Sequence, residues 1–410
     1  MSTSSEDRKL REVISLDSEL NQIQDLDILL ERILREARRI VNADAGSIYR
    51  KRGDELVISY AQNDTMQADL PPGQKLIYYI FSFPINEKSI AGYTAVTAEP
   101  VNIPDCYNIP EEAPYGFNQE TDKKSGYTTR SMLTSPLQTN TGEILGVIQV
   151  INAMDDEGNV IPFDAEDELV VSHFAQNATV ALQRAQMTRA ILLRMISMAE
   201  LRDPKETGPH VNRVAGYAVE IYERWAHRVG LPAKQIERNR DLLRMSAMLH
   251  DVGKVAISDT ILKKPARFTD DEYEIMKSHT WKGGKLFLDV QSEFDEMAGV
   301  VALNHHERWD GKGYPGHIDV ETGDPLKADE NGKAVGKQGT EIPLFGRIVA
   351  LADVYDALSS KRVYKEAWTE EEVLEEMRRA SGTQFDPELL EVFFEVLPNI
   401  KTISNRYRDN

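Results

Sequence analysis

The sequence has almost no cysteine and no long apolar run. Of its 410 residues only Cys106 is a cysteine, which excludes an intramolecular disulfide framework and any zinc site built from several thiolates. The first residues, Met1 to Arg11, are polar and charged, without the apolar core of an export signal. No stretch approaches the roughly 20 apolar residues of a membrane-spanning helix. We therefore expect a cytoplasmic protein that does not enter a membrane.

Positive charge is also in short supply. The chain carries 48 Lys and Arg residues against 67 Asp and Glu residues, a formal net charge of −19. This balance argues against binding of a nucleic-acid polymer by bulk electrostatics, although a few cations or a metal can still bind a small phosphate ligand. Apolar residues make up 41% of the chain, which is enough for ordinary folded cores. At roughly 150 residues per domain, the length predicts two or three domains.

Three regions differ in their residue patterns. Apolar residues at helical spacing from Leu26 to Ile40 predict an amphipathic helix, and short strand-like runs follow it. Residues 164–203 contain no Gly or Pro, which predicts one long helix. Beyond residue 203 the pattern is almost entirely helical. We therefore predict an α+β chain with four parts: a helical segment over 1–24, a domain with an antiparallel sheet and helices over 25–163, a connecting helix over 164–203 and an all-α domain over 204–410.

The connecting helix has an apolar stripe that is not a clean heptad repeat. One interpretation is a helix that packs only on its own domains. The other is a parallel dimer helix that passes a signal from the first domain to the second, as long helical patterns often indicate coiled coils. We expect a homodimer through this helix.

Histidines are concentrated in the all-α region. Seven of the eight histidines fall between His210 and His317. Imidazole and carboxylate together are typical ligands of iron, manganese, nickel or catalytic zinc. We interpret the isolated His173 and His227 as ordinary core histidines. The candidate metal ligands are Glu206, His210, His250, Asp251, His279, His305, His306 and Asp353.

The local context supports this interpretation. His250 and Asp251 follow an apolar stripe, so both side chains are expected beside the core, where an unpaired carboxylate is costly. Gly253 permits close approach of another segment, and Lys254 could contact a phosphate or assist a leaving group. Asp353 lies within a strongly apolar helix, where a carboxylate is expected to be paired or bound to metal.

The region from about residue 200 to 397 resembles the HD-GYP family of metal-dependent cyclic di-GMP phosphodiesterases. The matching motifs, in chain order, are Arg202-Asp-Pro, Gly208-Pro-His210, His250-Asp-Val-Gly-Lys254, Ile261-Leu-Lys-Lys-Pro265, His279, His305-His-Glu-Arg-Trp-Asp-Gly-Lys-Gly-Tyr-Pro315, Ile342-Pro-Leu-Phe-Gly-Arg-Ile348, Ala352-Asp353 and Arg362-Val-Tyr-Lys365. The resemblance implies hydrolysis of cyclic di-GMP to linear pGpG or GMP. It also implies a site with two or three divalent ions, iron or manganese favoured, and no organic cofactor in the catalytic domain.

The resemblance also implies roles for individual residues. Asp251 would bridge two metals, Lys254 would stand beside the site, and Tyr314, Arg362 and Lys365 would bind the substrate. Family members with Glu at the position of Glu206 resemble three-metal sites, so we expect a third metal held partly by Glu206, with a solvated glutamate as the alternative.

Two departures from the family pattern affect this interpretation. Val363 replaces a proline, a mild change. Residues 317–340 form a polar insertion, which is either a flap over the site or a solvated surface loop. Alternatives for the whole domain are a non-hydrolysing cyclic di-GMP binding protein, a hydrolase of cyclic GMP-AMP or of simpler nucleotides, and an oxidative di-iron enzyme.

The first domain resembles a GAF sensor domain over about residues 25–184. The matching segments are Ala43-Asp-Ala-Gly-Ser-Ile48, Ser89-Ile-Ala-Gly-Tyr93, Asn102-Ile-Pro-Asp105, Ser131-Met-Leu133 and Gly146-Val-Ile-Gln-Val150. In GAF domains that bind cyclic nucleotides, a further pattern is matched here by Asn152, Phe163, Asp167 and Glu168, but Ala153 replaces its lysine. The resemblance leaves two alternatives, a small-molecule ligand or a ligand-free domain used for dimerisation.

Overall fold

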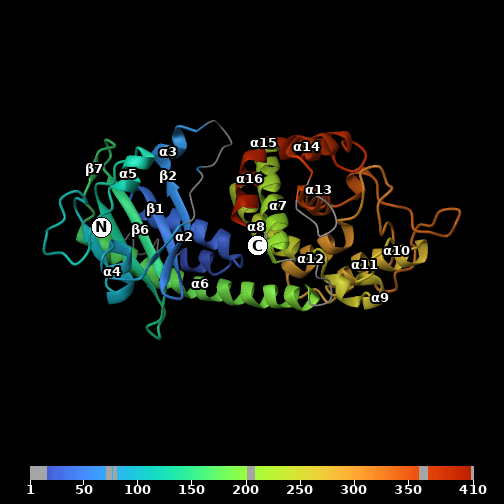
Figure 1. The fold of residues 1–410 in the computed structure, drawn as a ribbon, viewed down its shortest axis with the longest axis horizontal. Helices are drawn as coiled ribbons and strands as arrows, with labels where there is room; N and C mark the ends of the chain where they lie inside the picture. The colour runs from blue at the N-terminus through green and yellow to red at the C-terminus, as the bar shows by residue number, and fades with distance from the viewer. Residues whose placement is uncertain (1–15, 71–75, 77–80, 201–207, 360–367, 408–410) are drawn as a thin grey trace, which may run out of the picture. The chain divides into compact units, whose positions relative to one another are not determined.

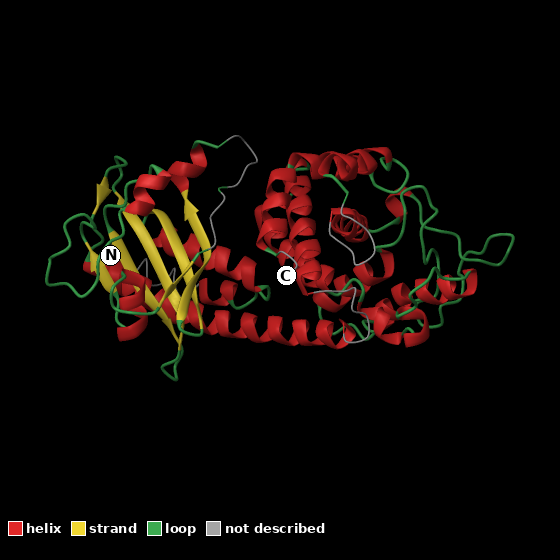
Figure 2. Cartoon of the chain, viewed as in Figure 1, coloured by secondary structure: helices red, strands yellow, loops and turns green. Residues whose placement is uncertain are grey.

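The chain folds into two compact units. The structure, a computed structural model, describes residues 16–70, 76, 81–200, 208–359 and 368–407. One unit is Met1–Arg189 and the other is Ala190–Asn410. Figures 1 and 2 show a sheet with helices in the first unit and helices alone as regular elements in the described part of the second.

A single antiparallel sheet organises the first unit. Its strands follow the order β3-β2-β1-β6-β5-β4, and β7 pairs with β6. At the centre, β1 and β6 pair with Ile48 opposite Ile148. The predicted strand runs and the antiparallel sheet are confirmed. The strands are β1 (Ala43–Arg52), β2 (Glu55–Asn63), β3 (Ser82–Pro84), β4 (Val101–Ile103), β5 (Met132–Gln138), β6 (Ile144–Met154) and β7 (Val160–Ile161).

Helices pack on both faces of this sheet. The helix α2 (Leu26–Ile40) begins after Asp25, whose side chain accepts hydrogen bonds from two backbone N–H groups of the first turn. Its apolar stripe joins that of α6 and the Ile48 face of the sheet in one core. On the other face, α4 (Ile90–Thr97) contacts β5 and β6. The short helices α3 (Asp64–Ala68) and α5 (Glu120–Ser125) lie in connections.

The long helix α6 (Ala165–Glu200) confirms the predicted connecting helix. Within the first unit, one side of α6 is buried in the core. The other side carries exposed apolar residues, Leu169, Val180 and Met187, the last of them 64% exposed. A helix that is apolar on both sides can contact a second partner as well as its own core.

Helices form the second unit. Its α-helices are α7 (Gly208–Arg228), α8 (Ala233–Met248), α9 (Asp259–Leu262), α10 (Asp270–Lys277), α11 (His279–Lys285), α12 (Glu293–Asn304), α13 (Leu344–Ser359), α14 (Glu370–Arg379), α15 (Pro387–Glu395) and α16 (Leu397–Arg406). Two 3₁₀ turns are η1 (Val252–Ala256) and η2 (Gly339–Glu341). Val214, Leu243, Val301 and Ile348 bring α7, α8, α12 and α13 into one core. The predicted all-α domain is confirmed.

The insertion at residues 317–340 is a structured loop that lies on α10 and α11. Lys285 of α11 donates to the backbone oxygen of Glu321 at 2.6 Å. Lys333 pairs with Glu274 of α10 at 2.9 Å. Gly323 has a φ of +81°, and a Cβ there would lie 2.8 Å from the indole of Trp281, so the loop approaches α11 closely.

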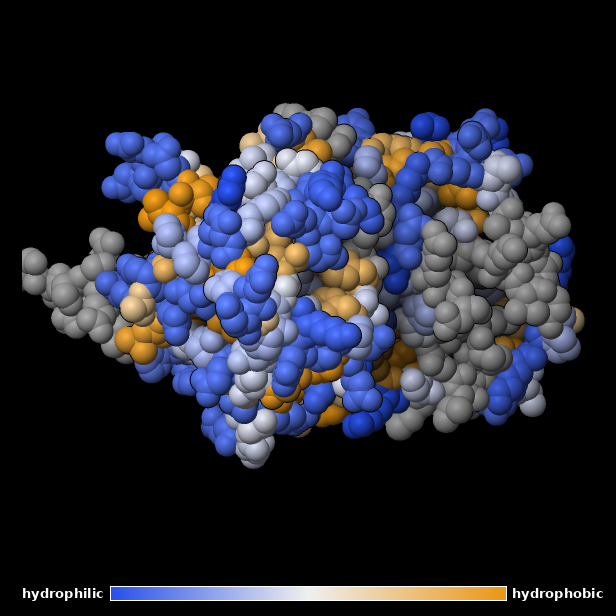
Figure 3. Space-filling view, turned by 60° about the vertical axis from the view of Figure 1, so that its left-hand side comes forward, coloured by the Kyte–Doolittle hydropathy of each residue, from blue (hydrophilic) through white to orange (hydrophobic). Residues whose placement is uncertain are grey.

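Hydrophilic residues dominate the described part of the face drawn in Figure 3, with apolar residues in scattered patches. Among the residues that the structure describes, no helix combines the length and apolarity needed to cross a membrane.

Candidate metal centre

Seven of the eight predicted metal ligands come together in two groups. The first group contains Asp251, His279, His305 and His306, and the second contains His210, His250 and Asp353. Within each group the ligand atoms all lie within 4.8 Å of one another. Residues far apart in the sequence therefore converge as metal ligands do.

Asp251 links the two groups. Its Oδ1 lies 3.1 Å from Nε2 of His279 and 3.6 Å from Nε2 of His305, both in the first group. Its Oδ2 lies 3.2 Å from Nε2 of His250, in the second group. One carboxylate oxygen thus faces each group, which is the arrangement a bridging carboxylate needs.

Close backbone approach brings the ligands together. His250 and Asp251 follow the end of α8, and His279 opens α11. A Cβ at Gly253 would lie 1.9 Å from the backbone oxygen of His279, so only glycine allows η1 and α11 to meet here. A Cβ at Gly346 would likewise lie 2.7 Å from the side chain of Asn304, the last residue of α12 before His305.

Backbone carbonyls orient the imidazoles. Nδ1 of His250 lies 2.7 Å from the carbonyl oxygen of Ala247, and Nδ1 of His279 lies 2.7 Å from that of Met276. Nδ1 of His305 lies 3.0 Å from the carbonyl oxygen of Ala302. A carbonyl can only accept, so each Nδ1 carries the proton and each neutral ring keeps its Nε2 lone pair for the centre.

This arrangement fits a cation. Oδ1 of Asp251 is buried and has no hydrogen-bond donor among the described residues. The Nε2 atoms of His279 and His305 face each other at 3.4 Å, each with a lone pair. Such groups repel one another unless a positive charge lies between them, and an imidazole and carboxylate set suits a divalent transition metal.

Burial and nearby charge shift the pKa values of these residues so that the imidazoles are neutral and the carboxylate is charged. Burial lowers the pKa of His305, and burial together with His305 lowers the pKa of His306 well below its ordinary value, so both rings stay neutral. Burial alone would raise the pKa of Asp251, but the charge of Lys254 holds it well below the usual range. Nζ of Lys254 lies 2.9 Å from Oδ2 of Asp251.

A buried ion pair behind the second group was not predicted from the sequence. Nδ1 of His210 donates to Oδ2 of Asp356 at 2.8 Å. Arg213 pairs with the same carboxylate, Nε to Oδ1 at 2.6 Å. The Nε2 of His210 is thereby left toward Asp353, at 3.6 Å. The sequence feature that could have indicated Asp356 is its i, i+3 spacing from Asp353, which places both carboxylates on one face of a helix.

Tyr314 lies beside the first group. Its ring centroid is 4.8 Å from that of His306 and 6.4 Å from that of His279. Glu307, also missed from the sequence, holds this loop: it accepts hydrogen bonds from the backbone N–H of Gly316 at 2.6 Å and of Lys337 at 3.2 Å. The predicted neighbours Lys254 and Tyr314 are therefore both next to the ligand groups.

Other predicted residues have different outcomes. Glu206, Arg362 and Lys365 lie outside the described residues. The interpretation of His173 and His227 as core histidines is wrong, because both side chains are exposed. His173 lies on the solvent side of α6 and His227 in the last turn of α7.

In the first unit, residues of the cyclic-nucleotide pattern have structural partners. Asn152 donates to the hydroxyl of Tyr127 and accepts from the backbone N–H of Arg130. Phe163 is buried in the core. Asp167 accepts from the backbone N–H of Asp164, just before α6. These contacts account for the three residues without a ligand.

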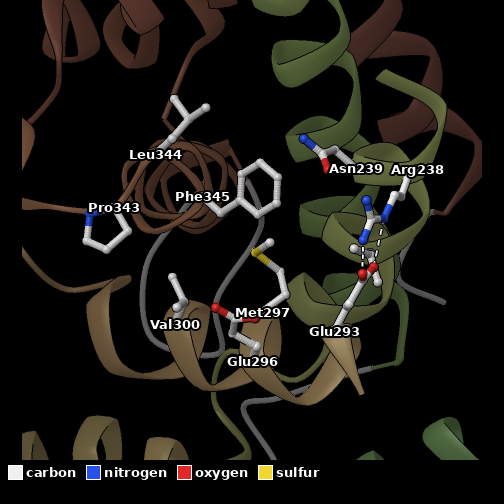
Figure 4. A pocket seen from close by; sticks show the side chains of 10 residues that line it. Arg238, Asn239, Glu293, Glu296, Met297, Val300, Pro343, Leu344 and Phe345 are labelled. Atoms are coloured by element: carbon white, nitrogen blue, oxygen red, sulfur yellow. Dashed lines mark hydrogen bonds and ion pairs between the residues drawn. The ribbon is translucent and has the colours of Figure 1, made fainter. Parts of the chain in front are cut away.

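A cavity of about 440 Å³ lies between α8, α12 and the start of α13 (Figure 4). Apolar side chains such as Met297 and Phe345 line it, and at its edge Arg238 pairs with Glu293. None of its lining residues belongs to the metal-ligand groups, so the chemistry of those groups is not assigned to it.

Comparison with known families identifies both units. The family model of the GAF domain matches residues 25–182, and that of the HD domain matches residues 207–358. The predicted GAF and HD assignments are confirmed.

Several curated proteins are similar to the chain. A 3′3′-cGAMP-specific phosphodiesterase of Vibrio cholerae is 36% identical over 54% of this chain and 37% of its own length. A cyclic di-GMP phosphodiesterase of the same organism is 34% identical over 62% of this chain and 50% of its own. A cyclic di-GMP phosphodiesterase response regulator of Xanthomonas campestris is 35% identical over 57% and 58%. The chain thus spans only about a third to three fifths of these relatives.

Proposed function

We propose that this chain, a GAF domain followed by an HD domain, is a metal-dependent phosphodiesterase that hydrolyses cyclic di-GMP to linear pGpG or GMP. The position of Asp251, with one oxygen toward each ligand group, carries the proposal. Relatives named cyclic di-GMP phosphodiesterases support the substrate.

The proposed cofactor is two divalent ions, iron or manganese. Asp251, His279, His305 and His306 would hold one, and His210, His250 and Asp353 the other. When bound, ions at such a site activate water for attack on phosphorus and neutralise phosphate charge. From the sequence we extend the proposal to a third ion held partly by Glu206.

The remaining residues would bind and orient the diester. Lys254 directs its ammonium into the space beside Asp251 and would offset negative charge on the departing 3′ oxygen. Tyr314 would form one wall, because its ring packs against that of His306. Burial raises the pKa of its phenol, which stays protonated. Arg362 and Lys365 are proposed as phosphate ligands from the sequence alone. Water oxygen would form the new bond to phosphorus while the bond from phosphorus to the 3′ oxygen breaks, and the 3′ oxygen would leave with a proton that comes from this water.

The first domain and α6 would regulate this activity. We propose that the GAF domain senses a small ligand and that the chain forms a homodimer through α6, whose exposed Leu169, Val180 and Met187 support a contact between copies. Met187→Glu should convert a dimer to a monomer in sedimentation experiments, because it places a charge in the exposed apolar stripe.

The test is metal analysis of anaerobically purified protein beside turnover of cyclic di-GMP by the same sample. The assay includes 3′3′-cyclic GMP-AMP, because one relative is named as specific for it. Three ions per chain with linear product would support the role of Glu206, and two would support the enzyme without that role. Full metal content without turnover of cyclic di-GMP would overturn the proposed function, and turnover of 3′3′-cyclic GMP-AMP alone would replace its substrate.

A further inference from the structure

Two side chains of α10 lie beside the metal-ligand groups without belonging to them. Tyr273 is 45% exposed, and its ring centroid is 6.3 Å from that of Tyr314. Tyr314 in turn packs against the ligand His306. Tyr273 is therefore the outer ring of a row that begins at the metal ligands and ends in solvent.

Lys277 holds the two tyrosines together. Its Nζ lies 4.7 Å from the ring centroid of Tyr273 and 5.6 Å from that of Tyr314. At these distances the ammonium is attracted by both rings. In a chain with a net charge of −19, Lys277 also places a positive charge at the edge of the site, where an anionic substrate would approach.

Polar contacts, more than packing, fix the position of α10. None of its residues is buried. Oε1 of Glu274 accepts from Lys277 at 3.1 Å and from Lys333 at 2.9 Å. Since Lys333 belongs to the loop at 317–340, this loop braces the helix that carries Tyr273.

A cyclic dinucleotide offers flat bases next to its phosphates, and exposed aromatic rings bind bases by stacking. We propose that Tyr273 stacks a purine base of the substrate, with Lys277 as its charged partner, while a phosphate lies at the metal-ligand groups. This inference rests on the proposed function and adds the residues that position the nucleotide. It also gives the 317–340 loop a role, which is to hold this surface in place.

The test is steady-state kinetics of the full metal-loaded chain with cyclic di-GMP. Tyr273→Ala should raise KM about tenfold, with kcat changed by less than about twofold, since stacking contributes to binding more than to the chemical step. Tyr273→Phe keeps the ring and should behave like the unaltered protein. Ile275→Ala is the matched control, because Ile275 is 44% exposed on the same helix.

A simple diester without a purine, methyl p-nitrophenyl phosphate, separates this inference from the proposed function. Tyr273→Ala should leave its hydrolysis unchanged. An unchanged KM for cyclic di-GMP, or an equal loss on both substrates, would overturn the stacking role alone. If the unaltered protein hydrolyses the simple diester but no cyclic dinucleotide, the proposed function fails, and the stacking role fails with it.

Discussion

Two enclosed carboxylates, one in each unit, have opposite surroundings. Asp122 of the GAF unit is 7% exposed and accepts hydrogen bonds from the backbone N–H of Thr129 at 2.6 Å and from the hydroxyl of Tyr107 at 2.9 Å. Asp251 of the HD unit has a side chain 12% exposed, and its Oδ1 faces imidazole lone pairs with no donor among the described residues. Asp122 is satisfied by the protein itself, whereas Asp251 pairs with Lys254 through Oδ2 and its Oδ1 is placed to bind a cation. The partners of a carboxylate, more than its burial, distinguish a structural residue from a metal ligand.

The largest expected effect is that of Asp251→Asn, and the same change at Asp122 serves as its control. Asp251→Asn keeps the shape but removes the negative charge that faces both ligand groups. We expect loss of bound metal and a fall in turnover of about a thousandfold or more. Metal analysis and turnover of cyclic di-GMP on one sample would measure both.

Asp122→Asn is the matched control. It should lower the free energy of unfolding by about 1–3 kcal/mol, since an amide cannot accept all the hydrogen bonds of the carboxylate, while metal content stays unchanged. Denaturant titration would measure the first effect. Full metal content in Asp251→Asn would contradict the distinction between a structural Asp122 and a metal-binding Asp251.

Asp356 provides an intermediate case, because it pairs with Arg213 and also contacts His210, a candidate metal ligand. Asp356→Asn should weaken the orientation of His210 and lower metal affinity by about 10- to 100-fold, as other partners of metal-bound histidines do. Competition with a chelator would measure the affinity. Asp386→Asn is a suitable control, because Asp386 pairs with Arg347 away from the ligand groups. Equal affinities in the two variants would reduce Asp356 to a purely structural residue.

The candidate metal ligands could be selected from the sequence because their residue types are chemically informative. Histidines and aspartates in an apolar helical region are costly unless bound, so His250, Asp251 and Asp353 could be chosen before any geometry was known. Short strand-like runs likewise indicated the sheet, and the absence of Gly and Pro over residues 164–203 indicated the long α6.

The supporting residues could not be found in this way. The pairing of Arg213 with Asp356 joins residues 143 apart, and either residue alone is an ordinary helical charge. Tyr273 and Lys277 have no unusual spacing, and only their proximity to Tyr314 draws attention to them. Conversely, His173 and His227 were assigned to the core from residue type alone, although their positions on the helices expose them.

Metal removal should affect the two units differently. With metal at about 100 times its dissociation constant, binding stabilises the folded HD unit by about 2.7 kcal/mol, or roughly 5–10 °C in melting temperature for a unit of this size. The GAF unit should melt at the same temperature with and without chelator. Calorimetry of the full chain would resolve the two transitions, and an equal shift of both would contradict independent units.

The smallest expected effect is the pH dependence of metal affinity, which tests whether burial keeps the candidate histidine ligands neutral. Burial lowers the pKa of His305 and of His306, so protons compete for Nε2 only below the ordinary imidazole pKa of about 6.5. Two unshifted histidines would lose roughly tenfold in metal affinity between pH 7.5 and pH 6, because each must be neutral to bind. We expect His305 and His306 to contribute a smaller loss than two unshifted histidines would, measured by Mn²⁺ titration calorimetry at the two pH values. A tenfold loss of metal affinity would contradict this expectation, because it would mean that burial does not keep the two histidines neutral.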